Sequence, residues 1–358
     1  MGVLTIEVDA QKLKDVVKRS DRVCGTLEPS NRRLAFFAQD GKLYALASDG
    51  CLKGSFELSP YLFSRSFQPF EISLDVLKQF SSELSGKVNL LIQDGIITFK
   101  CQNEILRLKV NYVDNIQIQK IAEKGIKMAR RKFLSEIDYS SCFLEEGNNV
   151  DVFISGNLLE LISHYAGILS YVKLNVGQNE LTGASYSISI PYVSSRHVVK
   201  ALDLEESEEI IIYYDEYEKK LHLKSTHLYT LCGDTPAENP ERVRNVCSQF
   251  KVHSKISASQ LQKLLRRSLI SGRFSDVQLY TRLGEVVVVS QYGSIAYKGS
   301  MEADINAIFS VKTKANLLRS ALNRIGSQNI LVDVIDDFVV FSSPSLTRFL
   351  ILRNERVQ

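Results

Sequence analysis

Basic side chains recur at helical spacing in the chain, and the first such row lies near its start. Lys14, Lys18 and Arg22 follow one another at intervals of four residues, on the side opposite Val16 and Val17. Residues spaced in this way share one face of a helix. Such a row can contact the phosphates of a nucleic-acid backbone through non-specific, salt-sensitive attraction.

The same chemistry is expected in other helices. In SASQLQKLLRRS (257–268) the leucines form an apolar stripe, and basic side chains lie on another face. For any single helix, a solvated basic face is the more common explanation. Recurrence in equivalent helices favours one continuous phosphate-facing surface. Its further candidates are Arg130, Arg131, Arg196, His197, Lys200, Lys263, Arg266, Arg267 and Arg319.

No arrangement of residues indicates catalysis. The histidines at 164, 197, 222, 227 and 253 are scattered, without a Ser-His-Asp order, an HExxH pair or a glycine-rich phosphate loop. The acids of DVIDDF (333–338) could suggest a metal site, but Asp336 and Asp337 stand where other repeats have a hairpin turn. We therefore expect a protein that is not an enzyme and that has no metal and no cofactor.

Composition is that of an ordinary globular protein. The 358 residues are 44% hydrophobic and 24% charged, with a net charge of +3, so the chain can form two or three domains. No apolar run is long enough to span a bilayer, and the first residues lack the pattern of a secretory signal. Six cysteines without a CxxC pair indicate reduced thiols rather than a zinc site or a dense disulfide framework. We expect a cytoplasmic protein with no membrane partner.

One pattern of strands occurs three times, in residues 34–58, 150–174 and 276–302. Each copy has a strand, a turn at Gly41, Gly156 or Gly284, a second strand, a polar turn and a third strand. The stretch LISHYAGILSYV (161–172) fits a helix or two strands equally well by its own periodicity. Aligned with the β-branched and Asp-Gly hairpin stretches of the other copies, it is predicted to be strand–turn–strand.

The repeat extends on both sides of this pattern. A strand and a helix are predicted before it, at 5–23, 125–146 and 254–270, and a strand, a short helix and three strands after it, at 70–110, 187–232 and 308–352. Fixed-order similarity of this kind indicates a repeated architecture. The predicted fold is α+β, with three domains at 1–117, 118–246 and 247–358, each with two helices on antiparallel sheets. Residues 112–124 and 234–246 are predicted linkers.

Charge is unevenly distributed among these domains. The first has 15 basic and 14 acidic residues, the second 14 and 19, and the third 15 and 8. Basic helices in an almost neutral chain suit non-specific DNA binding. No base-reading motif is evident, so recognition of a particular sequence is not implied.

The chain resembles the β subunit of bacterial DNA polymerase III, the sliding clamp, as a divergent member. The resemblance rests on the order of elements along the whole chain and is best in QDGKLYALASDG (39–50), VGQN (176–179), SISIPYVSSRHVVKAL (187–202) and the series from ISASQLQKLL (256–265) onward. It implies two chains joined head to tail in a six-domain ring around duplex DNA, with the helices lining the hole. The ring would tether a replicative polymerase.

The resemblance also implies a pocket for short peptides of a polymerase or clamp loader. HYAGILS matches one wall and gives Gly167, Ile168 and Leu169; NPERVRNV gives Pro240 and Val246; FLILRN gives Leu350 and Leu352. Arg353 stands where the family has proline and is expected to favour an acidic peptide residue. For each aliphatic residue, ordinary core packing is almost as good an explanation.

A second interpretation is a clamp-like repeat scaffold that binds proteins and does not encircle DNA. It would share the fold, but it would not need basic helix faces in every domain. The weak basicity of the middle domain keeps this alternative open.

Overall fold

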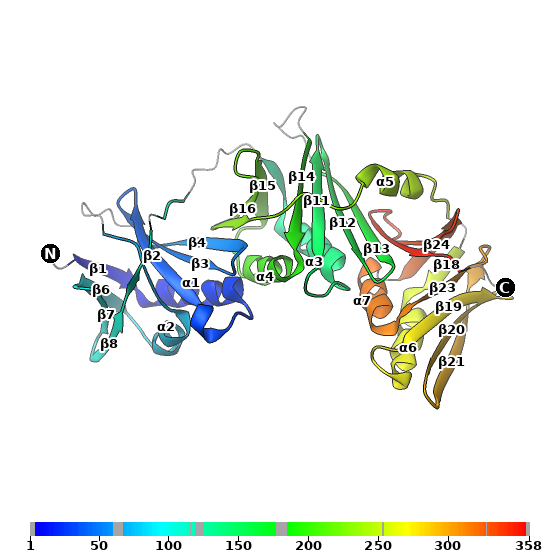
Figure 1. Ribbon diagram of the computed structural model, residues 1–358, viewed down its shortest axis with the longest axis horizontal. Coiled ribbons are helices and arrows are strands. Elements are labelled where there is room, and N and C mark those ends of the chain that lie inside the picture. Colours follow the sequence, from blue (N-terminus) through cyan, green and yellow to red (C-terminus); the bar gives the residue numbers. More distant parts are fainter. Residues whose placement is uncertain are drawn as a thin grey trace. The chain divides into compact units, whose positions relative to one another are not determined.

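The computed structural model describes residues 4–59, 67–114, 116–118, 125–176, 185–252, 254–326 and 328–355. The same order of strands and helices occurs three times along the chain, which confirms the repeated architecture (Figure 1). The first repeat contains β1 (Leu4–Asp9), α1 (Ala10–Cys24), the 3-10 turn η1 (Pro29–Asn31), β2 (Arg33–Gln39), β3 (Lys42–Ser48), β4 (Leu52–Ser59), β5 (Phe70–Ser73), α2 (Leu74–Ser81), β6 (Lys87–Gln93), β7 (Ile96–Cys101), β8 (Glu104–Lys109) and β9 (Asn111–Tyr112).

The other repeats follow the same order. The second contains β10 (Ile126–Ala129), α3 (Arg130–Ser141), β11 (Asn149–Ser155), β12 (Leu158–Tyr165), β13 (Ile168–Asn175), β14 (Ser185–Pro191), α4 (Tyr192–Leu202), β15 (Glu209–Asp215), β16 (Lys220–Lys224) and β17 (Leu228–Leu231). After α5 (Pro240–Ser248), the third contains β18 (Ser254–Ser257), α6 (Ala258–Ser268), the 3-10 turn η2 (Leu269–Ser271), β19 (Asp276–Arg282), β20 (Glu285–Tyr292), β21 (Ile295–Glu302), β22 (Asp304–Ile305), β23 (Ser310–Lys314), α7 (Ala315–Ile325), β24 (Asn329–Ile335), β25 (Phe338–Ser342) and β26 (Arg348–Arg353).

The stretch 161–172 is strand–turn–strand, as predicted. β12 ends at Tyr165 and β13 begins at Ile168, and these two residues pair across the hairpin. Ala166 and Gly167 make the turn with φ values of 51° and 77°, a left-handed pair typical of a tight hairpin.

The chain forms two compact units. The first comprises Met1–Leu134 and Arg196–Gly233, and the second comprises Ser135–Ser195 and Asp234–Gln358. Residues of the middle repeat therefore belong to both units. The division into domains at 1–117, 118–246 and 247–358 describes the repeats and stays a prediction.

Among the described residues, each unit has one large and one small antiparallel sheet. In the first unit the strand orders are β10-β15-β16-β17-β4-β3-β2-β5-β9 and β1-β6-β7-β8. In the second unit they are β14-β11-β12-β13-β26-β25-β24-β18-β22 and β21-β20-β19-β23. Each large sheet joins strands of two repeats, through β17 and β4 in one unit and through β13 and β26 in the other.

Helices lie in pairs against these sheets. In the first unit α1 packs beside α2 and across β3 and β4, and in the second α6 packs beside α7 and against β20 and β21 (Figure 1). The side chain of Asp9 caps α1 by accepting hydrogen bonds from the backbone N–H groups of Gln11 and Lys12. Leu13, Val16 and Val17 are buried on one side of this helix, so its basic side is left to solvent.

The second predicted linker is wrong in part, because residues 240–248 form α5. Asn239 caps this helix by accepting a hydrogen bond from the N–H of Glu241, and Pro240 is its first residue. Proline suits this position, where a backbone N–H would have no partner within the helix. The first predicted linker, 112–124, lies partly outside the described residues.

The expectation that all thiols are reduced is also corrected. Cys51 and Cys232 form a disulfide within the first unit, with Cα atoms 4.9 Å apart. The two cysteines are 181 residues apart in the sequence, so their pairing could not be predicted from spacing. They meet because β4 and β17 are neighbouring strands in one sheet.

Candidate functional site

The predicted basic row on α1 is largely accessible. Lys18 and Arg22 are exposed, and Lys14 is half-buried. The apolar residues of the same helix are buried, so the amphipathic pattern read from the sequence describes this helix correctly. Contact with DNA stays a prediction for these three residues.

Basic side chains are also exposed on α6. Lys263, Arg266 and Arg267 are all exposed, whereas Leu261, Leu264 and Leu265 are buried on the other side. Among the remaining candidates, Arg131 and Lys200 are exposed, and Arg196 and Arg319 are half-buried.

Two members of the predicted phosphate-facing set lie in the interior. Arg130 is buried, and its guanidinium donates to the carbonyl oxygens of Ser207 and Leu202 at 2.7 and 2.6 Å. His197 is buried with its Nδ1 2.7 Å from Oδ2 of Asp49. Both side chains bind other residues inside the first unit, and neither is exposed enough to contact a phosphate. Their assignment to the DNA-facing surface was wrong.

A buried charge cluster in the first unit had no signature in the sequence. Arg19, on α1, donates to Oε1 of Glu205 at 2.8 Å, and Tyr229 donates to the same oxygen at 2.6 Å. Nδ1 of His227 lies 3.0 Å from that carboxylate as well. Burial opposes ionisation of Glu205, but the hydrogen bonds from His227 and Tyr229 and the positive charge of Arg19 lower its pKa to about 2.

The residues of the predicted peptide pocket divide between the two faces of a sheet. Ile168 pairs with Leu352, and Leu169 with Ile351, in neighbouring positions of β13 and β26. Side chains alternate between faces along a strand, so Leu169 and Ile351 share one face, and Ile168, Leu350 and Leu352 share the other.

The second of these faces belongs to the core. Ile168, Leu350 and Leu352 are fully buried, on the same face as Arg348, which forms an ion pair with Glu136 of α3. They are core residues, and their assignment to the pocket was wrong by one position of register.

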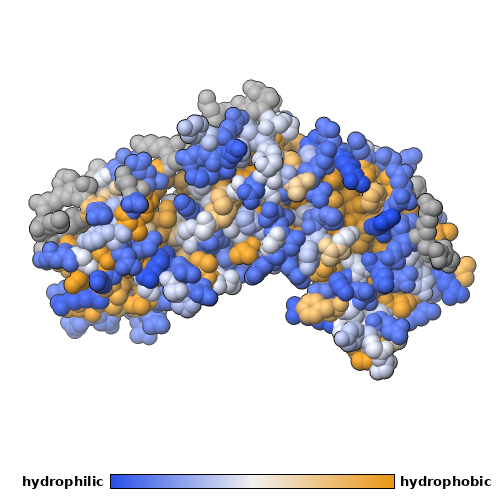
Figure 2. Space-filling model, in the orientation of Figure 1, coloured by the Kyte–Doolittle hydropathy of each residue, from blue (hydrophilic) through white to orange (hydrophobic). Residues whose placement is uncertain are grey.

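The opposite face carries an apolar cluster that α5 covers in part. The cluster consists of Phe153, Ile162, Tyr171, Val243, Ile335, Val340, Phe349 and Ile351. Leu169 and Val246, both predicted for the pocket, are partly buried against it. Pro240 begins α5 and is half-buried, and Gly167 lies exposed in the β12–β13 turn. Figure 2 shows hydrophobic surface gathered beside α5, over the C-terminal strands.

A hollow of about 260 Å³ remains at one end of this cluster. It is lined by Tyr171, Lys173, Arg244, Cys247, Ser248, Phe250, Leu346 and Phe349. Beneath it, Tyr171 donates to Oε1 of Glu160 at 2.5 Å, and Nε of Arg244 donates to the same oxygen at 2.7 Å. Burial, and then the bond to Glu160, raise the pKa of Tyr171 far above its usual value, so its hydroxyl remains a donor.

Arg353, expected at the rim of the pocket, is exposed at the end of β26. Strand alternation places it on the same face as Leu169 and Ile351. Its effect on peptide choice stays a prediction.

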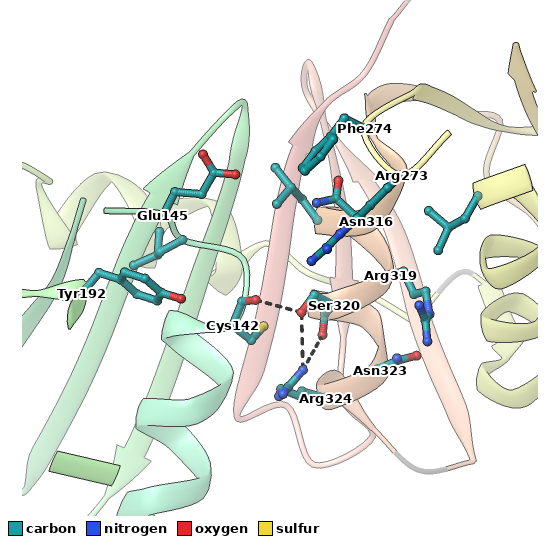
Figure 3. A pocket seen from close by; sticks show the side chains of 13 residues that line it. Cys142, Glu145, Tyr192, Arg273, Phe274, Asn316, Arg319, Ser320, Asn323 and Arg324 are labelled. Atoms are coloured by element: carbon teal, nitrogen blue, oxygen red, sulfur yellow. Dashed lines mark hydrogen bonds between the residues drawn. The ribbon is translucent and has the colours of Figure 1, made fainter. Parts of the chain in front are cut away.

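A larger pocket, of about 760 Å³, lies beside α7. Asn316, Arg319, Ser320, Asn323 and Arg324 line it from this helix (Figure 3). Ser320 donates to the carbonyl oxygen of Cys142 at 2.8 Å, which ties the helix to the segment after α3. Arg319 is a predicted phosphate contact, but no pocket is predicted from the sequence at this place.

Both small sheets end in accessible strands. β8 and β21 are edge strands of the two four-stranded sheets. Ile105 on β8 is 54% exposed and Ile295 on β21 is 48% exposed. An edge strand with exposed apolar side chains is a ready partner for another strand.

Within the described part of the chain, no group of histidine, cysteine and acidic residues has an arrangement that could hold a metal ion. Asp336 lies in the β24–β25 turn with φ 51°, in agreement with the predicted turn. Asp333 is buried and accepts a hydrogen bond from the backbone N–H of Lys251 at 2.6 Å. None of the described helices has the length and apolar character that crossing a membrane requires.

Comparison with solved structures identifies the fold. The DNA polymerase III subunit beta of Pseudomonas aeruginosa matches 99% of this chain and 100% of its own, with a TM-score of 0.82 and 11% identity. The beta subunit of Thermotoga maritima (TM-score 0.79, 17% identity) and the DNA polymerase sliding clamp of Bacillus subtilis (0.81, 14%) each match 100% of both chains. No protein-family model and no curated protein matches the sequence. The chain therefore has the sliding-clamp fold over its full length, with a strongly divergent sequence.

Proposed function

We propose that this chain is a DNA sliding clamp, of which two copies close head to tail around duplex DNA and tether a replicative DNA polymerase. The observation that carries the proposal is the match to beta-subunit structures over the full length of both chains. The exposed basic residues of α1 and α6 support it, because they are accessible on helices that occupy equivalent places in the repeats. The protein is a non-catalytic accessory subunit in this proposal.

The proposed domains are the three repeats, 1–117, 118–246 and 247–358. Six of them would make the ring, with the first domain of one chain meeting the third domain of the other. The exposed edge strands β8 and β21 lie in those two domains and are the strands we propose to pair. Ile105 and Ile295, which are exposed on these strands, would supply apolar side chains at the proposed junction.

The DNA-facing set is revised to side chains that reach solvent. Lys18, Arg22, Lys263 and Arg267 are its principal members, because they are exposed on α1 and α6. Lys14, Arg131, Arg196, Lys200, Arg266 and Arg319 complete it. Contacts of this kind are non-specific and weaken with salt. The proposed ring would therefore remain on DNA because it encloses the duplex, and not because its contacts are strong.

The peptide groove is revised in the same way. We place it on the face of β13 and β26 that carries Leu169, Phe349 and Ile351, beside Val246 of α5. A few apolar side chains of a polymerase or clamp-loader peptide would supply most of the affinity there. Lys173 and Arg244 line the adjoining hollow.

The experiment that tests the proposal compares nicked circular DNA with the same DNA after linearisation. The protein, loaded by its clamp loader, is separated from free protein by gel filtration at moderate salt. We expect retention on the circle and loss from the linear form. Equal retention on both forms would contradict encirclement and favour ordinary DNA binding, and absence from both would favour the protein-binding scaffold.

A charge-matched pair of variants assigns the contact surface. Replacing Lys18, Arg22, Lys263 and Arg267 with alanine should reduce loading and residual duplex binding. The control replaces Lys53, Lys100, Lys127 and Lys255, which are exposed on strands. An equal loss in both variants would mean that net charge, and not the helix faces, governs binding.

A further inference from the structure

The pocket beside α7 is separate from the peptide groove and contains an unusual combination of groups (Figure 3). The polar side of α7 forms one wall. Tyr192 and Glu145 lie on the other, and Phe274 lies at one end. Its volume of about 760 Å³ falls in the range of roughly 300–1,000 Å³ that ligand sites occupy.

Two guanidinium groups in this pocket are available to an anion. Arg324 is held by Asp138, with Nε 2.6 Å from Oδ2. Arg273 and Arg319 form no salt bridge or hydrogen bond with other described residues. A phosphate or a carboxylate could occupy this part of the pocket, since arginine binds both.

A second feature favours a hydrogen-bond donor on the ligand. Oδ1 of Asn316 is buried and accepts no hydrogen bond from the described residues. The carboxylate of Glu145, which accepts a hydrogen bond from Tyr165 at 2.6 Å, is a further acceptor in the lining. A simple anion such as sulfate would satisfy neither, because it has no donor, and it would be repelled by Glu145. The amino and imino groups of a nucleobase are donors.

A third feature is an exposed aromatic face. The ring of Phe274 is 63% exposed, and the guanidinium carbon of Arg273 lies 5.6 Å from its centroid. An aromatic ring with an arginine beside it forms a surface on which bases of unpaired strands stack. The carboxylate side chains of an acidic peptide, the other ligand with negative charge, would not stack on this ring.

From these features together we infer that the pocket binds a nucleotide of single-stranded DNA. The phosphate lies against Arg273 and Arg319, the base stacks on Phe274, and the edge of the base donates to Asn316. Duplex DNA cannot enter in this way, because its bases are stacked and paired. The inference goes beyond the proposed encirclement of duplex, which needs no base contact.

The test measures binding of a short fluorescent single-stranded oligonucleotide by anisotropy, beside a hairpin duplex of the same composition. The double variant Arg273→Ala, Phe274→Ala removes one phosphate partner and one stacking partner. It should bind the single strand at least tenfold more weakly, since stacking on one aromatic ring alone contributes roughly fivefold to a hundredfold. Binding of the duplex should change by less than threefold.

The matched control is Arg282→Ala, Leu283→Ala, which removes one exposed cation and one exposed apolar side chain elsewhere in the same unit. It should leave binding of the single strand unchanged. An oligonucleotide with photoactivatable thiothymidine should crosslink to the peptide that contains Phe274 or Tyr192 in the unaltered protein. Circular dichroism of each variant checks that the fold is intact.

Three results would overturn the inference: unchanged single-strand affinity in the double variant, an equal loss in the control, or displacement of the oligonucleotide by a short polyglutamate peptide at similar concentration. The last would assign the pocket to acidic peptides. Failure here leaves retention on circular DNA unaffected, and failure of encirclement leaves this measurement unaffected.

Discussion

The guanidinium of Arg19 donates to the carboxylate of Glu205 across 2.8 Å, and both side chains are buried. This pair joins a helix of the first repeat to a segment of the middle repeat within one compact unit. Buried ion pairs contribute little compared with an apolar substitute, but loss of one partner leaves an uncompensated charge in the interior.

Replacement of Arg19 by methionine should therefore lower the free energy of unfolding by about 3–5 kcal/mol. The control is Lys87→Met, which breaks an exposed ion pair with Glu7 and should cost less than about 1 kcal/mol. The chain has no tryptophan, so urea unfolding is followed by circular dichroism. Equal effects of the two variants would contradict the buried cluster.

The same cluster should make stability depend on pH in the acid range. The pKa of Glu205 is lowered from 4.5 to about 2 in the folded chain. Its stabilisation is therefore fully present above pH 4.5 and is lost as the pH falls toward 2, where the folded state also takes up the proton. The size of the loss is on the order of 3 kcal/mol. The difference in stability between the unaltered chain and Glu205→Gln should shrink over this interval, and a constant difference would contradict the assignment.

A substitution at Gly25 should destabilise the first unit by more than its backbone conformation alone explains. Gly25 has φ +55°, and a Cβ atom there would lie 1.8 Å from Nε2 of His197. Gly25→Ala should displace His197 from Asp49 and lower the free energy of unfolding by about 2 kcal/mol or more. Gly86→Ala, with φ +77° and open space around it, controls for backbone strain and should cost about 1 kcal/mol.

Ring closure should depend on the two exposed edge strands. Ile105→Asp or Ile295→Asp alone should convert a dimer into monomer, because each places an unpaired charge in an apolar junction between strands. Ile308→Asp, at another exposed position, should leave the dimer intact. Light scattering at micromolar concentration gives the molar mass. A dimer that survives both edge substitutions would place the junction elsewhere.

Truncation should have different effects on the two sides of the sheet that contains β26. Leu352→Ala removes a fully buried side chain and should cost about 2–5 kcal/mol of stability. Val246→Ala, at the partly buried margin of the apolar cluster, should cost about 1 kcal/mol or less and reduce polymerase stimulation. Thermal melting and primer extension measure the two effects. Full stimulation by a stable Val246→Ala variant would move the groove away from α5.

The order of the elements could be predicted from the sequence because the pattern is repeated. Comparison with the other copies predicts strand–turn–strand for the ambiguous stretch 161–172, and β12 and β13 confirm it. α5 carried a visible signal, since asparagine followed by proline is typical of a helix start. The segment is nevertheless predicted to be a linker, because its apolar residues do not recur clearly at helical spacing.

The faces of β13 and β26 could not be predicted in the same way. FLIL is apolar at every position, and both faces of the sheet are covered there, so no alternation marks which side faces the helices. The burial of Arg130 and His197 could not be predicted from the sequence for a related reason. Their partners, Leu202 and Asp49, are 72 and 148 residues away, and spacing along a helix does not reveal such contacts.

The repeats and the compact units have different boundaries, because the pairings of β17 with β4 and of β13 with β26 join strands of neighbouring repeats within one unit. The segment that recurs in the sequence ends at positions where the sheets continue into the neighbouring copy. A middle repeat excised at 118 and 246 would leave one unsatisfied strand edge on each side, and such edges associate with whatever strand they meet. We therefore expect a segment transferred between chains of this architecture to keep its fold when both strands of a seam are exchanged together, and to lose it when one repeat is exchanged alone.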